Sequence, residues 1–210
     1  MYVSPAFRED DLKKLVDFMQ AFSFATLVTV VDNIPTASHV PLVTTVHDGV
    51  VKLTGHLAKA NPQWQAFGQA ESLAIFNDPH AYISPSLYEK RENVPTWNYI
   101  AVHAFGKPQM ITLAESPESI DAMIKAMVSF YEPAYKPQWD ALSAGYREGM
   151  MAAIVGFEMQ VTKLEGKYKL SQNRSHFDQS NVADSLLQHQ DMTVAQVGEA
   201  MQKNLSDQTQ

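Results

Sequence analysis

The residues between Gly55 and Trp64 combine side chains that could bind a phosphate group. A strand-like run ends here, and Asn61 followed by Pro62 is typical of the start of a helix. Free backbone N–H groups at a helix start attract anions, and Lys59 places a full positive charge just before them. The stretch therefore favours a site for a phosphorylated ligand or cofactor. The alternative is a plain capped helix with a solvated Lys59.

Histidines and a serine on the neighbouring segments could add to such a site. Ser38 and His39 on one expected strand could face the same pocket as His56 on the next. A neutral imidazole can bond a carbonyl or a ring nitrogen, and a protonated one can pair with phosphate. A metal site built from His39, His56 and His80 competes with this interpretation, but no carboxylate stands at the expected spacing.

Aromatic residues with polar tips gather between positions 82 and 99. Tyr82, Ser84, Tyr88 and Trp97 could supply flat surfaces and hydroxyls to a planar heteroaromatic ligand. The alternative is that Trp97 lies half buried in a core or in a dimer interface.

A basic segment follows the last expected strand. Lys169 and Arg174 could form a second anion-binding element, and Gln172 could bond an amide-like ring edge. A solvated basic turn explains the same residues without a ligand.

Composition restricts the function classes. The chain has 210 residues, no cysteine and a net charge of −7, so disulfides, thiolate catalysis and cysteine zinc sites are excluded. Its 16 Lys and Arg residues are scattered, which suits one small anion better than a nucleic-acid backbone. No apolar run is long enough for a membrane span, and the N-terminus has no secretory pattern. We therefore expect a cytoplasmic protein.

The hydrophobic periods predict an α+β protein that is mainly antiparallel β, a small barrel of six or seven strands with peripheral helices. The expected strands are 24–31, 37–46, 50–56, 72–77, 81–84, 97–112 (broken at 106–108) and 153–164. The expected helices lie near 12–22, 62–67, 116–130, 139–151, 178–189 and 194–204. The helix near 116–130 is expected to turn Ile120, Met123, Ile124, Met127 and Phe130 inward, and a capping box at Thr193 is expected to open the last helix.

Several motifs occur together in a recognisable order. They are Met1–Pro5 with Phe7, Ser38–Leu42, Gly55–Trp64, Tyr82–Ser86, Val94–Tyr99, and Gly166–Lys167 with Lys169–Arg174. With these motifs the chain resembles the PaiB family, whose members are described as FMN-binding negative transcriptional regulators. The resemblance extends from about Met1 to Leu187.

The resemblance implies a split β-barrel related to pyridoxine-phosphate oxidase and flavin reductases, and a homodimer with FMN near the interface. Together with the helical pattern that begins near Asp178, this predicts an FMN-binding split-barrel domain over 1–177 and a helical tail over 178–210 that packs on it or extends from it. By motif position, Lys59 and Asn61 would bind the phosphate. The residues that would contribute from the same or the facing subunit are Tyr82, Ser84, Trp97 and Asn98. The implied FMN-binding residues are Ser38, His39, His56, Lys59, Asn61, Trp64, Tyr82, Ser84, Trp97, Asn98, Lys169, Gln172 and Arg174.

Three functions remain open at this stage. The first is an FMN-binding regulator or flavin-linked metabolic sensor, and the second is an FMN-dependent oxidoreductase. The third is an interaction protein that kept the barrel without the cofactor. The tail helices lack the basic residues of a recognition helix, which argues against direct DNA binding.

Overall fold

The computed structural model describes residues 1–207, which form two compact units. Unit 1 comprises Met1–Leu15, Asn77–Val102 and the chain from Glu165 onward. Unit 2 comprises Val16–Phe76 and His103–Leu164. The predicted boundary between residues 177 and 178 stays a prediction.

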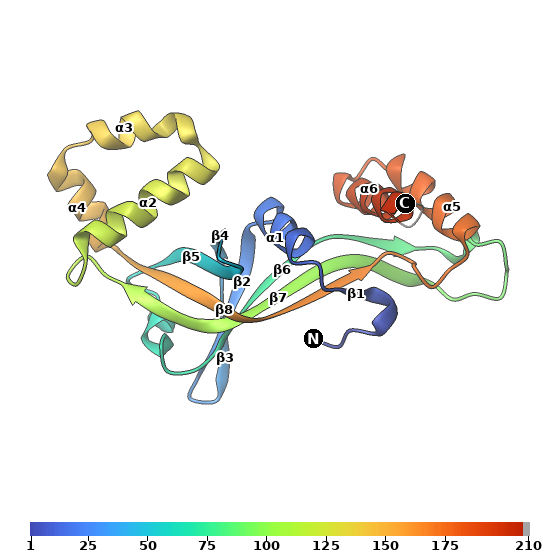
Figure 1. The fold of residues 1–210 in the computed structure, drawn as a ribbon, viewed down its shortest axis with the longest axis horizontal. Coiled ribbons are helices and arrows are strands. Elements are labelled where there is room, and N and C mark those ends of the chain that lie inside the picture. Colours follow the sequence, from blue (N-terminus) through green and yellow to red (C-terminus); the bar gives the residue numbers. More distant parts are fainter. Residues whose placement is uncertain (208–210) are drawn as a thin grey trace. The chain divides into compact units, whose positions relative to one another are not determined.

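The fold is built on an eight-stranded sheet (Figure 1), in which β1–β8, β2–β3, β2–β6, β4–β5 and β5–β8 pair antiparallel. This confirms the predicted α+β class. The strand order is β3-β2-β6-β7-β8-β5-β4, and β1 pairs with β8. The strands are β1 Arg8–Glu9, β2 Phe24–Val31, β3 Ile34–Pro41, β4 Val43–His47, β5 Val50–Ala58, β6 Ser72–Ile83, β7 Thr96–Ile111 and β8 Ile154–Lys169. The three long strands β6, β7 and β8 contribute residues to both units.

Six α-helices and four short 3-10 helices lie in the described part of the chain. The α-helices are α1 Leu12–Ala21, α2 Pro117–Tyr131, α3 Lys136–Ala141, α4 Ala144–Ala152, α5 His176–Leu187 and α6 Met192–Asp207. The 3-10 helices are η1 Pro5–Phe7, η2 Pro62–Ala66, η3 Pro85–Leu87 and η4 Pro133–Tyr135. None of the helices within residues 1–207 is long and apolar enough to cross a membrane.

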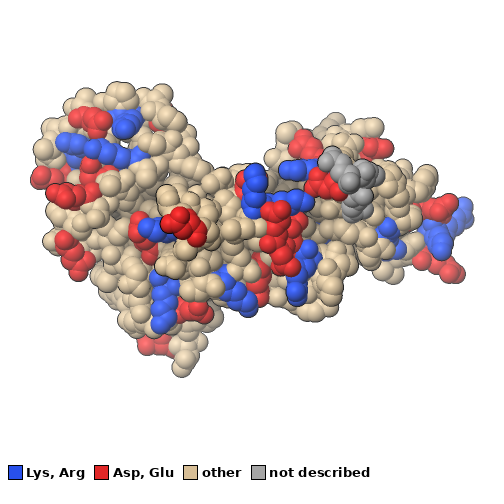
Figure 2. Space-filling view, in the orientation of Figure 1, with Lys and Arg blue, Asp and Glu red and all other residues tan. Residues whose placement is uncertain are grey.

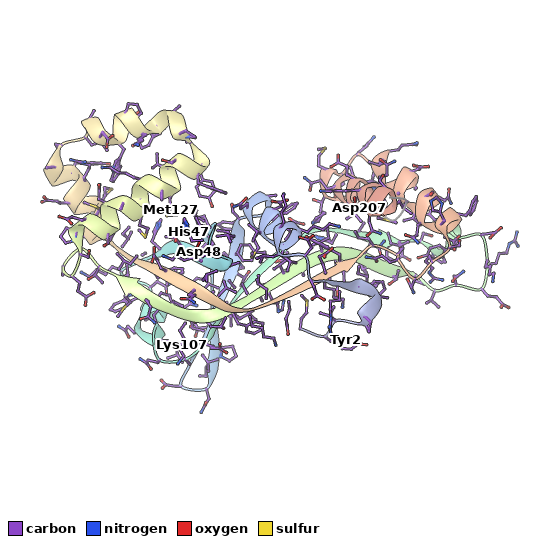
Figure 3. The ribbon with its side chains drawn as sticks, in the orientation of Figure 1. Tyr2, His47, Asp48, Lys107, Met127 and Asp207 are labelled. Atoms are coloured by element: carbon purple, nitrogen blue, oxygen red, sulfur yellow. The ribbon has the colours of Figure 1, made fainter. Side chains whose placement is uncertain are left out.

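In unit 2, alternate residues of the strands build two differently covered faces of the sheet. One face is a closed apolar core of Leu27, Leu42, Leu53, Phe76, Phe157 and Met159. On the other face of β4, β5 and β8, helix α2 packs through Met123 and Met127 onto Val43. Gly156 permits this packing, since a Cβ there would lie 2.6 Å from the Met123 sulfur. Figure 3 labels Met127 of α2, and His47 and Asp48 at the β4–β5 turn.

In unit 1, helices α5 and α6 pack against each other and bury an apolar core. The buried residues of this unit include Ile83, Ile100, Val102, Leu170, Val182, Leu186, Val197 and Met201. Gly198 allows the two helices to approach closely, since a Cβ there would lie 3.0 Å from the Ala183 carbonyl oxygen. Helix α6 also contacts Asn98, whose side-chain amide donates to the Met201 sulfur and to Ser171 Oγ.

Two expected breaks in the strands are absent, and one strand that was expected to be continuous is broken. Gly106, read as a turn, lies inside β7, where a Cβ would stand 2.3 Å from the Gln160 carbonyl oxygen. The glycine therefore serves the close approach of β8 and not a turn. Asp78–Pro79 lies within the continuous strand β6. The expected strand 37–46 is interrupted at Leu42, whose N–H donates to the Ser23 carbonyl.

Two details of the helices also differ from expectation. Phe130 was expected to point inward from α2, but its side chain is 37% exposed. Helix α6 begins at Met192, and the Asp191 carboxylate accepts from the Thr193 N–H at 2.9 Å. Asp191 therefore caps this helix, two residues before the expected cap at Thr193, because its carboxylate accepts from a backbone N–H of the first turn.

Candidate functional site: two groups of side chains

The turn after β5 forms as expected, but the helix that follows it is shorter than the anion argument requires. Asn61 caps η2, and its side-chain oxygen accepts from the Gln63 N–H at 3.0 Å. However, η2 is a five-residue 3-10 helix, Pro62–Ala66. Its few aligned peptides give a weak dipole. A phosphate at this turn therefore depends on side chains and not on the helix start.

The side chains of unit 2 that can bind a phosphate at this turn belong to Ser38, Lys59 and Asn61. The Asn61 side-chain amide donates to Ser38 Oγ at 2.8 Å, which joins β3 to the turn and leaves the hydroxyl proton of Ser38 free to donate elsewhere. Trp64 donates from Nε1 to the Lys59 carbonyl at 3.0 Å and so fixes the loop that carries the lysine. Within residues 1–207, the exposed ammonium of Lys59 has no recorded partner. We call Ser38, Lys59, Asn61 and Trp64 the turn cluster.

The two histidines predicted beside this cluster have different surroundings. His39 pairs with Thr26 across the sheet, and its Nδ1 lies 3.1 Å from the Thr26 hydroxyl. Neighbouring residues of a strand point to opposite faces, so Ser38 and His39 lie on different faces of β3. The sequence had suggested that both face one pocket. The Nδ1 of His56 is buried and has no hydrogen-bond partner within the described part of the chain. Burial lowers the pKa of His56 and favours its neutral form.

In unit 1, three aromatic rings form a second candidate surface. Trp97 on β7 lies 5.9 Å from Tyr82 and 5.9 Å from His80 of β6, measured between ring centroids. The Trp97 and Tyr82 side chains are 52% and 53% exposed. A cavity of about 340 Å³ adjoins Trp97 and Tyr99. The rings thus present open faces on which a planar ligand could stack.

The remaining polar candidates of unit 1 are held by the protein itself. Lys169 donates to the hydroxyl of Thr96 and to the Trp97 carbonyl, and its pKa is lowered by burial and by the charges of Lys167 and Arg174. These contacts take two of the three N–H donors of the ammonium that was expected to bind an anion. They give Lys169 the role of joining β8 to the start of β7.

The amides and the guanidinium of the same region are also occupied. Gln172 accepts from the Leu170 N–H and donates to the Tyr168 carbonyl. Arg174 donates to the side chain of Asn93, and its guanidinium lies 4.4 Å from the ring centroid of Tyr88. Tyr88 is buried beneath it and does not present the open ring that the sequence suggested.

Asn98 and Ser84 act in the framework as well. Asn98 is fully buried, and its amide donates to Ser171 Oγ at 2.8 Å and to the Met201 sulfur at 3.4 Å. Ser84 caps η3 by accepting from the Ser86 N–H. The structure therefore brings together Ser38, Lys59, Asn61 and Trp64 in one unit and Tyr82 with Trp97 in the other.

Sequence reasoning missed His80 as a member of the aromatic surface and considered it only for metal. His80 and Tyr82 lie two apart on β6, so they share a face of the sheet. That signal was hidden because Asp78–Pro79 was interpreted as a turn. Among residues 1–207, no group of three or more His, Cys, Asp or Glu side chains is placed to hold a metal ion.

Comparison with known proteins identifies the cofactor class of this chain. Residues 1–163 match the family model described as "Putative FMN-binding domain". The chain is 38% identical to the Bacillus subtilis protein named "Protease synthase and sporulation protein PAI 2", over 99% of this chain and 100% of that protein. It is 30% identical to an uncharacterized protein of Emericella nidulans, over 70% of this chain and 72% of that protein.

Solved structures show the same fold at low identity. The FAD and heme binding protein from Mycobacterium smegmatis superposes with a TM-score of 0.57, at 17% identity, over 77% of this chain and 73% of that chain. The flavocytochrome Anf3 from Azotobacter vinelandii gives a TM-score of 0.58, at 14% identity, over 80% and 72%. These likenesses confirm the predicted split β-barrel with peripheral helices. The chain belongs to the PaiB family of FMN-binding proteins, and its cofactor is FMN.

Proposed function

We propose that this protein is an FMN-dependent regulatory protein of the PaiB type that binds the FMN phosphate at the turn cluster. The observation that supports this most is the Ser38 hydroxyl held by Asn61, two residues after Lys59, whose exposed ammonium has no recorded partner among residues 1–207. A phosphate dianion needs charged and neutral donors together, and charge-assisted hydrogen bonds are the strongest of these. The donors at the turn cluster therefore suit the group that distinguishes FMN from riboflavin.

His56 is the second element of the proposed site. Its buried, unpartnered Nδ1 can donate to or accept from a polar edge of the flavin ring, depending on the tautomer. When bound, FMN supplies reversible electron transfer, and the chain supplies only binding and orientation. Neutral His56 bonds the ring edge without adding a charge beside it.

We infer that regulation proceeds through the flavin and not through direct contact with DNA. The B. subtilis relative is named for protease synthesis and sporulation, and it matches this chain end to end. On the face in Figure 2, Lys and Arg residues alternate with Asp and Glu residues and form no continuous basic area. Tight, sequence-specific duplex binding by the pure protein in a gel-shift assay would contradict this part of the proposal.

An FMN-dependent oxidoreductase is the second candidate function, and the exposed rings of Trp97 and Tyr82 favour it. Open aromatic faces beside a cavity of about 340 Å³ could receive a planar electron donor. The test is anaerobic mixing of the FMN-loaded protein with NADH or NADPH. Bleaching of the flavin absorbance supports this candidate, and an unchanged spectrum with both nucleotides counts against a nicotinamide-linked reductase.

We further propose a homodimer with FMN near the interface, in which the same two rings belong to the contact surface. Half-exposed aromatic side chains are enriched in such surfaces. Light scattering coupled to gel filtration gives the mass directly. A dimer that Trp97→Ala weakens supports the arrangement, and a monomer in the presence of FMN contradicts it.

The spectrum of the freshly purified protein tests the cofactor, and a titration tests the site. Flavin fluorescence should show saturable FMN binding to the wild-type chain that weakens in Lys59→Ala. Unchanged affinity in that variant would remove Lys59 from the site and with it the proposed position of the phosphate.

A further inference from the structure

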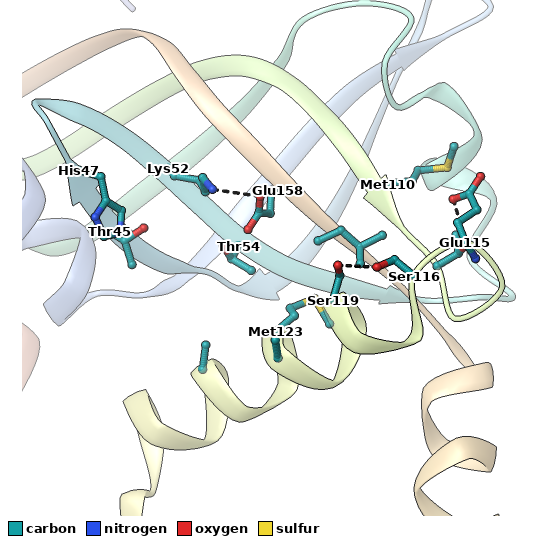
Figure 4. A pocket seen from close by; sticks show the side chains of 14 residues that line it. Thr45, His47, Lys52, Thr54, Met110, Glu115, Ser116, Ser119, Met123 and Glu158 are labelled. Carbon is teal, nitrogen blue, oxygen red and sulfur yellow. Dashed lines mark hydrogen bonds and ion pairs between the residues drawn. The ribbon is translucent and has the colours of Figure 1, made fainter.

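A cavity of about 510 Å³ lies in unit 2 between helix α2 and the sheet face formed by β4, β5 and β8 (Figure 4). Its volume is in the range of sites that hold small molecules. It is lined by none of the residues proposed above for FMN. The cavity is therefore separate from the proposed FMN site.

The floor of the cavity is polar and carries one charge of each sign. Lys52 on β5 and Glu158 on β8 form an ion pair with a separation of 3.0 Å between Nζ and Oε2. Thr45 lies opposite Lys52, and Thr54 lies opposite Glu158, so all four side chains share one face of the sheet. This arrangement offers a cation, an anion and two hydroxyls over adjacent strands.

The ion pair is able to exchange partners. Its two side chains are 40% and 43% exposed, and ion pairs with such exposure contribute little to the stability of a protein. A ligand that brings a carboxylate to Lys52 and an ammonium to Glu158 replaces one attraction with two. A ligand with a single charge leaves either Lys52 or Glu158 without a partner in the cavity.

The opposite wall has room because α2 presents small residues there. Ala122 and Ala126, one helical turn apart, are exposed and give this wall an apolar part, whereas Ser116 and Ser119, whose hydroxyls bond each other, line it at the start of the helix. Met123 of α2 and Met110 of β7 also line the cavity. Methionine side chains adapt to differently shaped apolar groups. The other titratable side chains of the lining are His47 and Glu115, and Glu115 already accepts from the Thr112 hydroxyl at 2.9 Å.

We propose that this cavity binds a small zwitterion with an apolar side chain, of the amino-acid type. The carboxylate pairs with Lys52, the ammonium pairs with Glu158, and the side chain lies against Ala122, Ala126 and the methionines. The threonine hydroxyls complete the hydrogen bonds of the two charged groups, since a hydroxyl both donates and accepts. This inference is independent of where FMN binds.

Calorimetric titration of the FMN-loaded protein with three matched probes tests the proposal. L-leucine carries both charges, 4-methylpentanoate lacks the ammonium, and 3-methylbutylamine lacks the carboxylate. Saturable leucine binding with a Kd of about 1 mM or below, and binding of each analogue at least about tenfold weaker, is the expected result. No saturable leucine binding, or equal binding of all three probes, would overturn the proposal.

Variants of the lining locate the site. Lys52→Met and Ala122→Leu should each weaken leucine binding at least about tenfold, the first by removing the cation and the second by filling the space. Lys107→Met is the matched control, since Lys107 is an exposed lysine of the same unit outside the cavity, and it should leave binding unchanged. FMN affinity should be unchanged in all three variants. Leucine binding that survives in both lining variants would overturn the assignment, and if a variant does not fold, the probe series on the wild-type chain decides.

Discussion

The turn cluster of unit 2 and the polar residues Asn98, Lys169 and Ser171 of unit 1 contain the same kinds of hydrogen-bond donor. The two groups differ in whether those donors already have partners within the chain. Lys59 in the first has no recorded partner among residues 1–207, whereas Lys169 in the second donates to Thr96 and to the Trp97 carbonyl. Asn61 orients the Ser38 hydroxyl at the surface, whereas Asn98 bonds Ser171 in the core. This difference is the basis of our proposal that donors without a partner bind the ligand, whereas donors that are already bonded support the fold.

Loss of the free lysine should have the largest effect. Lys59→Ala removes a charge-assisted contact to the phosphate, and we expect FMN affinity to fall by about 1.5–3 kcal/mol, roughly tenfold or more. Lys169→Ala is the matched comparison and should change affinity by less than about threefold. Flavin fluorescence titration measures both. Equal losses of FMN affinity in the two variants would contradict the claim that Lys59 binds the phosphate and Lys169 does not.

Loss of the buried asparagine should have the next largest effect, on stability rather than on binding. Asn98→Ala leaves the Ser171 hydroxyl without its partner in a fully buried position, and this should lower the free energy of unfolding by about 1–3 kcal/mol. Asn173→Ala changes an exposed asparagine of the same unit and should cost less than about 0.5 kcal/mol. Urea unfolding followed by circular dichroism gives both values, and similar values for the two variants would deny Asn98 its framework role.

Asn61→Ala tests whether one residue can serve both the fold and the ligand, because Asn61 caps η2 and also orients Ser38. Loss of the cap should reduce stability by about 1 kcal/mol. FMN affinity should fall as well, since the Ser38 hydroxyl is no longer held, but by less than in Lys59→Ala. A stability loss with unchanged FMN affinity would leave Asn61 with the structural role alone.

The smallest expected effect is a pH dependence due to His56. Burial lowers its pKa in the folded state below the unfolded value of about 6.5, so the unfolded state binds more protons between the two values. The contribution of neutral His56 to stability is therefore complete above about pH 6.5 and declines as the pH falls towards the lower folded pKa. Unfolding of wild type and His56→Gln at several pH values should show a steeper acid-side decline in wild type. Parallel curves would contradict this account.

The sequence predicted the framework well because most signals were local. The strand Phe24–Val31 and the cap at Asn61 follow from neighbouring residue types, and both occur as expected. The hydrophobic periods indicated a small barrel, and the family resemblance supplied its kinship with the split barrels and its cofactor FMN. These parts of the prediction needed no knowledge of contacts distant in sequence.

The prediction failed where a residue's role depends on distant partners. Gly106 was interpreted as a break because the approach of Gln160 from β8 leaves no mark in the nearby sequence. The hydrogen bonds that Lys169 and Gln172 make to the chain could not be read from residue type either, and their predicted role in FMN binding stays a prediction. The availability of a donor is a property of the folded chain, and only the structure separates Lys59 from Lys169.

The ratio of FMN affinity to riboflavin affinity tests the central claim most directly, since the two ligands differ only in the phosphate. We predict that wild type and Lys169→Ala strongly prefer FMN, and that in Lys59→Ala the preference falls at least about tenfold. If Lys59→Ala keeps the full preference, or if Lys169→Ala loses it, the phosphate is not bound at the turn cluster.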